Sequence, residues 1–328
     1  MIAEVGSVHD GSLGNALKLI DLAARCGADG VKFQTHIAAA ETLHGAPGPA
    51  YFREESRYEY FRRTGFTGDQ WSRLQKRCAE RGIEFLSSPF SIEAVELLES
   101  VGVVRYKIPS GEVTNLPLLQ VIAQTGKAVL LSSGMSSWAE LDAAVHTFLR
   151  WHDRVTVLQC TSAYPCPHEE VGLNVMLEMG RRYGLPFGLS DHTLTPYASL
   201  AAVALGASAI ERHLTFSRLM YGSDAPHSLE PEEFAEVVRG VRAVKAMLTT
   251  PVDKDAAAAR LAEMKAVFEK SIVTVADIPA GTVLHTGLLG LKKPGTGIPA
   301  RRLDEVLGRR VVRTIPKDTL LRDEDFDA

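Results

Sequence analysis

Two lysines lie in short β-branched runs of the sequence and are followed by hydroxyl side chains. Lys32 lies in one run, and Lys107 lies in another that ends at Ser110. Ammonium groups neutralise a phosphate dianion, and hydroxyls satisfy its remaining oxygens. The alternative is that the two lysines form internal ion pairs with Glu4 and Glu112. Because a buried charge costs several kcal/mol unless it is paired or used, we favour a phosphate pocket.

Two histidines end consecutive predicted strands and are therefore expected to be neighbours. His192 follows Ser190, and His213 follows Glu211. Two imidazoles together with Glu211 can hold a divalent cation that keeps positions open for substrate and water. A single histidine is usually an ordinary polar residue, but a pair beside a phosphate pocket favours a metal site. The remaining candidates, which we expect in loops, are His9, His36, His168 and His227.

The elements that must position these residues alternate between strand and helix patterns. Strands are expected at 2–7, 29–35, 83–89, 103–109, 128–133, 154–160, 186–191 and 207–215, with helical spacing between most of them. Helices between strands demand parallel pairing, and eight strands close a barrel. The first strand is not followed by a G-x-G-x-x-G motif, which disfavours an open dinucleotide-binding sheet. The expected class is α/β, a (β/α)8 TIM barrel.

The chain changes character after the barrel. We expect the barrel over 1–250, an exposed helical linker over 251–270, and a small β-rich domain over 271–328, where short β runs alternate with Pro- and Gly-containing turns. In a TIM barrel the active site lies where strands end. Asp224, in a loop after the last strand, is either a turn residue or part of that site.

Composition excludes several classes of function. The 328 residues carry 36 Lys and Arg against 40 Asp and Glu, so the net charge is −4, and 45% are hydrophobic. This balance disfavours nucleic-acid and membrane-surface binding. No apolar stretch is long enough to span a bilayer, and no secretion signal is evident, so a cytoplasmic protein is expected. The four scattered cysteines indicate neither a disulfide framework nor a zinc knuckle.

A series of ordered motifs resembles the sialic acid synthase (N-acetylneuraminate synthase) family. The motifs are IAEVGS, GADGVKFQT, FLSSPF, YKIPSGE, NLPLL, SSGM, CTSAYP, GLSDHT, GASAIERHLT and a GSD loop. The tail, with SIVTVADIPAGTVL and KKPGTGIP, resembles the antifreeze-like (SAF) domain of that family. The resemblance covers nearly the whole chain.

This resemblance implies a particular reaction and assembly. Phosphoenolpyruvate condenses with an aldehyde amino sugar such as N-acetylmannosamine, giving a nine-carbon 2-keto acid and phosphate through C–O cleavage. The implied cofactor is Mn2+ or Mg2+. The implied assembly is a domain-swapped homodimer in which one SAF domain caps the partner's barrel.

The resemblance also assigns residues to roles. The positions implied for phosphoenolpyruvate are Lys32, Lys107, Ser110, Ser132, Thr161, Ser162 and Ser190. The metal would be held by His192 and His213, with Glu211 beside it. Contacts to the acceptor sugar are implied for Glu4, Gln34, Glu112, Tyr164 and Asp224, and for Lys293 of the partner's tail. Any of Glu4, Glu112 and Glu211 can be the base that activates water.

Departures from the family pattern concern the acceptor. They are the opening segment 8–11, Ser162 in place of an Asn, the segment 51–60 without the expected Asn, and Lys293 in place of an Arg. The acceptor therefore stays open between N-acetylmannosamine and a sugar of legionaminic, pseudaminic, KDN or 6-phosphorylated type.

Two other functions fit the same residues. Lys107 can serve a Schiff-base aldolase, which would be indifferent to chelators. A non-catalytic carbohydrate-binding protein would use the barrel as a scaffold and the tail as its binding surface. The second alternative leaves two lysines and two histidines in the barrel mouth without a purpose.

Overall fold

The computed structural model describes residues 1–48 and 55–327. They form two compact units, Met1–Thr249 and Thr250–Ala328, so that 251–270 groups with the tail. Among the described residues, no helix is long and apolar enough to cross a membrane.

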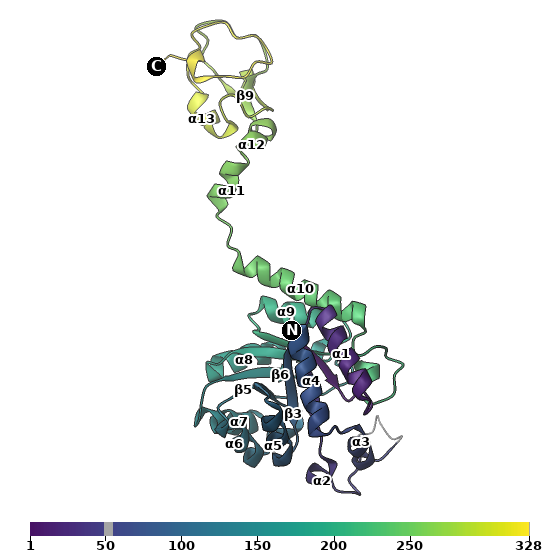
Figure 1. Ribbon diagram of the computed structural model, residues 1–328. Helices are drawn as coiled ribbons and strands as arrows, with labels where there is room; N and C mark the ends of the chain where they lie inside the picture. Colours follow the sequence, from purple (N-terminus) through teal and green to yellow (C-terminus); the bar gives the residue numbers. More distant parts are fainter. Residues whose placement is uncertain (49–54, 328) are drawn as a thin grey trace. The chain divides into compact units, whose positions relative to one another are not determined.

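The first unit is a closed barrel of eight parallel strands in sequential order, with helices around it (Figure 1). The strands are β1 (Ile2–Gly6), β2 (Gly30–Thr35), β3 (Glu84–Pro89), β4 (Arg105–Ile108), β5 (Ala128–Ser132), β6 (Val155–Cys160), β7 (Phe187–Asp191) and β8 (Ala209–His213). Each of the eight predicted strands overlaps one of these, and the predicted (β/α)8 barrel is confirmed. Closure comes from pairing of β1 with β8.

Helices occupy the connections between the strands, and most of them turn an apolar face toward the barrel. They are α1 (Leu13–Arg25), α2 (Ala38–Glu41), α3 (Arg57–Thr64), α4 (Gly68–Arg81), α5 (Ile92–Val101), α6 (Leu116–Gln124), α7 (Trp138–Leu149), α8 (Leu173–Tyr183), α9 (Tyr197–Ala204) and α10 (Pro231–Thr249). Helix α4 shows the local logic, because Thr67 and Gln70 form a capping box and Gly82 ends the helix at φ 68°. Its buried face presents Trp71 and Leu74 to the core. Short 3-10 turns follow strands at η1 (Ser110–Glu112), η2 (His168–Glu170) and η3 (Ala225–His227).

Strand register decides which polar side chains meet. Side chains alternate between the two faces of a strand, so residues two apart share the barrel interior. Glu4 pairs in register with Lys32 on one side and with His213 on the other. Ser190 pairs with Glu211. The closed register therefore gathers one layer of ionisable groups near the carboxyl ends of the strands.

The second unit is small and built around its own core. Its elements are α11 (Lys254–Arg260), α12 (Ala262–Phe268), β9 (Ser271–Thr274), η4 (Thr286–Leu288), β10 (Leu289–Lys292), η5 (Ala300–Arg302), α13 (Leu303–Val306) and η6 (Asp323–Asp325). Strands β9 and β10 pair antiparallel, and isolated bridges complete the β structure. Ile272, Ile278, Ile315 and Leu321 are fully buried in its core.

Candidate active site

A cavity of about 460 Å³ opens at the carboxyl ends of the barrel strands. Most of the predicted site residues line it together: Glu4, Lys32, Gln34, Lys107, Ser110, Ser132, Ser162, Tyr164, Ser190, His192, Glu211, His213 and Asp224. They come from β1, β2, β4, β5, β6, β7 and β8 and the loops that follow. Seven strands thus contribute to one site because a barrel brings all its strand ends to one mouth.

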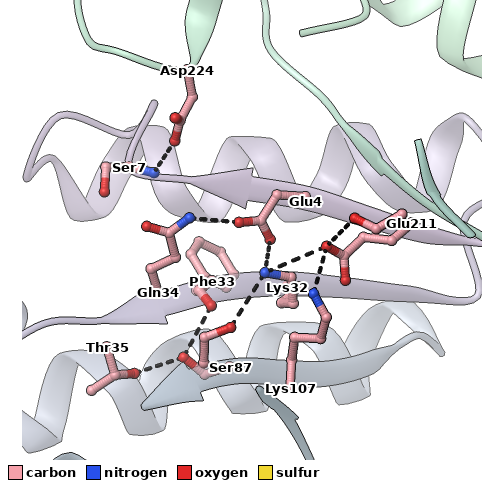
Figure 2. Close-up of polar contacts among 12 residues, drawn as sticks. Glu4, Ser7, Lys32, Phe33, Gln34, Thr35, Ser87, Lys107, Glu211 and Asp224 are labelled. Atoms are coloured by element: carbon pink, nitrogen blue, oxygen red, sulfur yellow. Dashed lines mark hydrogen bonds and ion pairs between the residues drawn. The ribbon is translucent and has the colours of Figure 1, made fainter. Parts of the chain in front are cut away.

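Two lysines and two glutamates form what we call the inner charge cluster, Lys32, Lys107, Glu4 and Glu211 (Figure 2). Lys32 Nζ lies 2.6 Å from Glu4 Oε2 and 3.8 Å from Glu211 Oε1. Lys107 Nζ donates to Glu211 Oε1 at 3.1 Å. The pairing of Lys32 with Glu4 is the one weighed above as an alternative, whereas Lys107 pairs with Glu211 and not with Glu112. All four side chains are at most 5% exposed.

The ion pairs of the cluster favour the charged forms of Glu211 and Lys32. Burial by itself would raise the pKa of the Glu211 carboxyl, but the charges of Lys107 and Lys32 outweigh burial and hold that pKa below its ordinary value. Burial opposes the charge of Lys32 as well, yet Glu211 and Glu4 raise its pKa above the ordinary value. A pair of fixed ammonium groups beside a cavity suits an anionic substrate.

Hydroxyl groups lie beside the two lysines in the cavity wall. Ser190 Oγ donates to Glu211 Oε1 at 3.2 Å. Ser132 Oγ is buried and has no hydrogen-bond partner among the described residues. The hydroxyls of Ser110 and Ser162 converge on Gly134, where an added Cβ would lie 2.4 and 2.5 Å from their oxygens. The two serine hydroxyls can approach this backbone closely because residue 134 is glycine.

The two histidines lie beside each other, with ring centroids 5.4 Å apart. His192 Nδ1 lies 2.9 Å from the carbonyl oxygen of Thr161, which fixes the proton on Nδ1 and leaves Nε2 as an acceptor. Burial, reinforced by His213, lowers the pKa of His192 to about 3, so the ring is neutral. His213 Nδ1 is buried and has no hydrogen-bond partner in the described part of the chain.

These two imidazoles fit a divalent cation, but the predicted third ligand does not join them. Among residues 1–48 and 55–327, no group of three or more His, Cys, Asp or Glu side chains is arranged to hold a metal ion. Glu211 Oε1 is engaged by Lys107 and Ser190, which turns it toward the lysines. The structure offers two imidazoles, and water or substrate would have to supply the other ligands.

Polar and aromatic groups form the opposite side of the cavity. Gln34 Nε2 donates to Glu4 Oε1 at 2.8 Å, and Asp224 Oδ2 accepts from the Ser7 amide at 3.3 Å (Figure 2). Asp224 packs so closely on Gly6 that an added Cβ there would lie 2.3 Å from Oδ2. Tyr164 lies 4.4 Å from His192, centroid to centroid. Carboxylate, amide and phenol groups of this kind bind sugar hydroxyls.

Three predicted site residues are placed differently from the rest. In the described part of the chain, Thr161 and Glu112 do not line the cavity. The Thr161 hydroxyl donates to the Glu170 carbonyl at 2.6 Å, so Thr161 supports His192 instead. Glu112 accepts from Asn115 Nδ2 at 2.8 Å, and burial raises its pKa. Lys293 belongs to the second unit, where its ammonium lies 4.9 Å from the Phe268 ring centroid.

The cavity also has lining residues that the sequence analysis did not single out. His36, expected in a loop, is buried and lines the cavity together with Phe61, Phe90 and Tyr60. The sequence contains a signal for this position. His36 follows Gln34 by two residues, so its side chain is expected on the same inward face as those of β2. Of the segment 51–60, residues 51–54 lie outside the described residues.

Fold and site together define a class of protein: a TIM-barrel enzyme with an anion pocket beside two histidines and a small β-rich tail. A family model described as the NeuB family matches residues 19–253, and one described as the SAF domain matches residues 269–327. The chain belongs to the NeuB family. The predicted family resemblance is confirmed.

Individual relatives agree with this membership. The chain is 36% identical to the N,N'-diacetyllegionaminic acid synthase of Campylobacter jejuni, with 98% of each chain covered. It is 35% identical to human N-acetylneuraminate-9-phosphate synthase, covering 100% of this chain and 92% of that one. A solved N-acetylneuraminic acid synthetase from Leptospira borgpetersenii matches with a TM-score of 0.70 at 30% identity, covering 80% of this chain and 90% of that one. The chain is thus an enzyme of the nonulosonic acid synthase family.

Proposed function

We propose that this protein condenses phosphoenolpyruvate with an aldehyde amino sugar to give a nine-carbon 2-keto acid and phosphate. The observation that carries the proposal is the inner charge cluster facing a cavity, in which one hydroxyl and one imidazole nitrogen have no hydrogen-bond partner among residues 1–48 and 55–327. The names of the matched relatives, which are synthases of sialic- and legionaminic-type acids, support the same reaction class.

In the proposed reaction, C3 of phosphoenolpyruvate attacks the aldehyde carbon, water adds at C2, and phosphate leaves by cleavage of its C–O bond. Lys32 and Lys107 hold the phosphate and stabilise its charge as it leaves. The hydroxyls of Ser110, Ser132, Ser162 and Ser190 satisfy its other oxygens. As the anion binds, the lysines exchange part of their pairing with Glu211 for phosphate oxygens.

His192 and His213 are the residues that would hold Mn2+ or Mg2+. Bound there, the cation would polarise the aldehyde oxygen as a Lewis acid. Thr161 keeps His192 in the ligating tautomer through its carbonyl oxygen.

Among the three candidate bases, we assign proton transfer to Glu112. A general base works best when its pKa is near the operating pH. The two lysines hold the pKa of Glu211 low, and Glu4 Oε2 is paired with Lys32. Burial raises the pKa of Glu112, and its turn η1 follows the cavity-lining Ser110 and Gly111. Because Glu112 accepts from Asn115 and does not itself line the cavity among the described residues, its carboxyl group has to leave Asn115 and turn into the cavity to act.

The pairing of Lys107 argues against the Schiff-base alternative. Formation of a Schiff base needs a neutral amine. Lys107 Nζ instead donates to a buried carboxylate at 3.1 Å, which favours the ammonium form. Failure of borohydride to trap a substrate adduct on Lys107 would agree with this assignment.

Gln34, Tyr164 and Asp224 are proposed to contact the acceptor, with Lys293 supplied by the partner of a domain-swapped homodimer. This assembly follows from the family resemblance. Light scattering together with acceptor KM values for Lys293→Ala tests it. A dimer whose acceptor KM is unchanged by the substitution would remove Lys293 from the site.

The decisive experiment measures phosphate release from phosphoenolpyruvate across a panel of aldehyde sugars, with Mn2+ and with EDTA. The panel contains N-acetylmannosamine, its 6-phosphate, mannose and amino hexoses of the legionaminic and pseudaminic types. We expect release to require both the metal and one class of sugar. Release that needs no sugar, or no release with any sugar, would contradict the proposal.

A further inference from the structure

A chain of hydrogen bonds runs outward from the inner charge cluster through Gln34 to His36 and Glu41. Glu4, which is paired with Lys32, accepts from Gln34 Nε2 at 2.8 Å. Gln34 Oε1 lies 3.1 Å from His36 Nε2. His36 Nδ1 lies 2.7 Å from Glu41 Oε1. Figure 2 shows the inner half of this chain, with the Gln34 amide oxygen turned away from Glu4.

Donor and acceptor accounting fixes the protons along this chain. A carboxylate paired with Lys32 can only accept, so the Gln34 NH2 group must face Glu4. The Gln34 oxygen then faces His36, and His36 Nε2 must carry a hydrogen to donate to it. A neutral imidazole with its hydrogen on Nε2 has a bare nitrogen at Nδ1, which would lie 2.7 Å from a carboxylate oxygen with no hydrogen between them. An additional proton must therefore lie between Nδ1 and Glu41.

We propose that His36 and Glu41 share this proton and thereby hold Gln34, and through it Glu4, in the orientation that the acceptor sugar meets. His36 and Glu41 are positioning residues, since neither needs to touch the reacting atoms. The inference rests on the proposed function, because it concerns the side of the cavity assigned to the acceptor.

Packing holds the imidazole ring of His36 in one orientation. The His36 ring is stacked on the rings of Phe61 and Phe90. The ring centroids are 3.6 Å apart for Phe61 and 4.1 Å apart for Phe90, and the interplanar angles are 7° and 22°. The side chains of His36 and Glu41 are 4% and 5% exposed. Glu41 Oε2 is buried without a hydrogen-bond partner among the described residues. A carboxyl group so poorly solvated needs either a cation beside it or a proton of its own, and the shared proton meets both conditions.

Other charged groups face this pair from neighbouring elements. His9, from the loop after β1, has its pKa lowered to about 4 by burial and by the charge of His36, so it stays neutral. Glu112 interacts electrostatically with Glu41 and with Arg57. Arg57 lies 5.2 Å from the Phe61 ring centroid. The negative charges of Glu41 and Glu112 thus outnumber the nearby cations unless His36 is protonated, which favours the extra proton.

Two substitutions of Glu41 separate the hydrogen-bonding role from packing. Glu41→Met keeps the volume but removes the acceptor at Nδ1, so His36 can bind its hydrogen on either nitrogen. Glu41→Gln can donate its amide to Nδ1, which holds the Nε2–H tautomer without an extra proton. We expect Glu41→Met to lower kcat/KM for the acceptor by about tenfold or more. Losses of this size are typical when a residue that orients a ligand-contacting side chain through a hydrogen bond is removed. Glu41→Gln should recover most of that loss.

The measurement is steady-state phosphate release with the acceptor and phosphoenolpyruvate varied separately. The control is Glu96→Gln, an exposed glutamate on α5. The KM for phosphoenolpyruvate should stay unchanged in all three variants, and the loss in Glu41→Met should include a higher KM for the acceptor. A smaller fraction of folded enzyme would lower kcat and leave both KM values unchanged. Equal loss in Glu41→Met and Glu41→Gln, or no loss in either, would overturn the inference. If the wild-type protein released no phosphate with any sugar, the proposed function would fail instead.

Nitrogen-15 NMR of histidine-labelled protein provides a test that needs no turnover. We expect His36 Nε2 to be protonated in the wild-type protein and in Glu41→Gln, with the resonance assigned from a His36→Gln sample. An unprotonated Nε2 in the wild-type protein would refute the proton arrangement, whatever the enzyme condenses.

Discussion

Two buried groups of charges lie on opposite faces of the barrel wall, and β8 contributes a residue to each. The inner charge cluster faces the cavity and draws Glu211 from β8, with Ser190 of β7 beside it. The outer charge cluster, which we define as Asp191 and Arg212 with Ser199, lies between those strands and α9. Because side chains alternate along a strand, residues one apart in the sequence belong to different sides of the barrel wall.

The outer charge cluster is closely connected by hydrogen bonds. Asp191 Oδ1 accepts from the Thr193 amide at 2.9 Å, and Oδ2 accepts from Ser199 at 2.6 Å and from Arg212 at 2.5 Å. Arg212 also donates to the carbonyl oxygens of Thr193 and Thr195. It ties the loop after β7 to β8 and so fixes the backbone next to both histidines.

The inner charge cluster keeps unused capacity. Glu211 Oε2, Ser132 Oγ and His213 Nδ1 are buried without hydrogen-bond partners among the described residues. Native structures leave few such atoms, and those left need an explanation. Here the three residues line the cavity, which indicates that a bound ligand supplies the missing hydrogen bonds. Arg212 Nε of the outer charge cluster is also buried without a partner among the described residues, but Arg212 does not line the cavity. Similar burial and charge thus serve as a scaffold on one face and as a site on the other, and access to the cavity distinguishes the two.

Arg212→Met should produce the largest effect and act on stability. Removing one partner of a buried ion pair leaves the charge of Asp191 uncompensated, which costs about 3–5 kcal/mol. Denaturant unfolding measures this loss. Arg105→Met, which breaks a partly exposed pair with Glu84, is the control and should cost about 1 kcal/mol or less. If both variants unfolded at the same denaturant concentration, the outer charge cluster would not be the scaffold described.

Lys107→Met tests the inner charge cluster and should act mainly on activity. Loss of one group that stabilises the leaving phosphate should lower kcat by about 100- to 1000-fold. The drop in unfolding free energy should be smaller than in Arg212→Met, because water in the cavity can solvate Glu211. Phosphate release and denaturant unfolding are measured on the same preparations. Lys18→Met, at a side chain that is 75% exposed, is the control. A kcat within threefold of wild type would contradict the site assignment.

Glu112→Gln tests a carboxyl group that lies outside both charge clusters. If Glu112 transfers the proton, kcat should fall by about 100-fold while the KM for phosphoenolpyruvate changes little. The raised pKa of Glu112 also predicts an acidic limb in the wild-type kcat profile, because the base is lost as the pH falls through that pKa. An acidic limb that persists in Glu112→Gln would assign the proton transfer to another group.

The smallest predicted effect concerns His9, a buried group that neither cluster uses. Its pKa is lowered to about 4 from an ordinary value near 6.5, so the unfolded chain binds the proton that the folded protein excludes. Stability should therefore fall by about 2 kcal/mol from this residue between pH 7 and pH 5. His9→Asn keeps an acceptor for the Gly11 amide and should flatten that decline. Unfolding curves at the two pH values measure the difference, and equal declines in both proteins would exclude His9 as the cause.

Much of the site was predictable because it lies at strand ends. Lys32, Lys107, His192 and His213 each fall at or near the end of a β run, and a barrel makes all such ends neighbours. The pairing among them was not predictable in the same way. Lys107 forms its ion pair with Glu211, which is 104 residues away in the sequence, and not with Glu112 in the loop that follows β4. That choice depends on barrel closure, which local pattern does not contain.

His36 lies in the loop after β2, as expected, but its burial in the cavity wall was not predicted, for a related reason. Its neighbours Phe61, Phe90 and Glu41 come from three further segments, and no single stretch of sequence displays the stack that buries it. Thr161 was assigned to the substrate, whereas its hydroxyl and carbonyl are both used within the protein.

The amino-acid sequence by itself determined the eight strands, their parallel order and the kinds of chemical group at the barrel mouth. These follow from alternation and spacing, which are properties of neighbouring residues along the chain. Only the tertiary structure decided which charged groups are paired and which polar atoms of the cavity have no hydrogen-bond partner among the described residues. Hydrogen-bond satisfaction depends on ångström-scale distances between residues far apart in the chain, and those distances exist only once the barrel has closed.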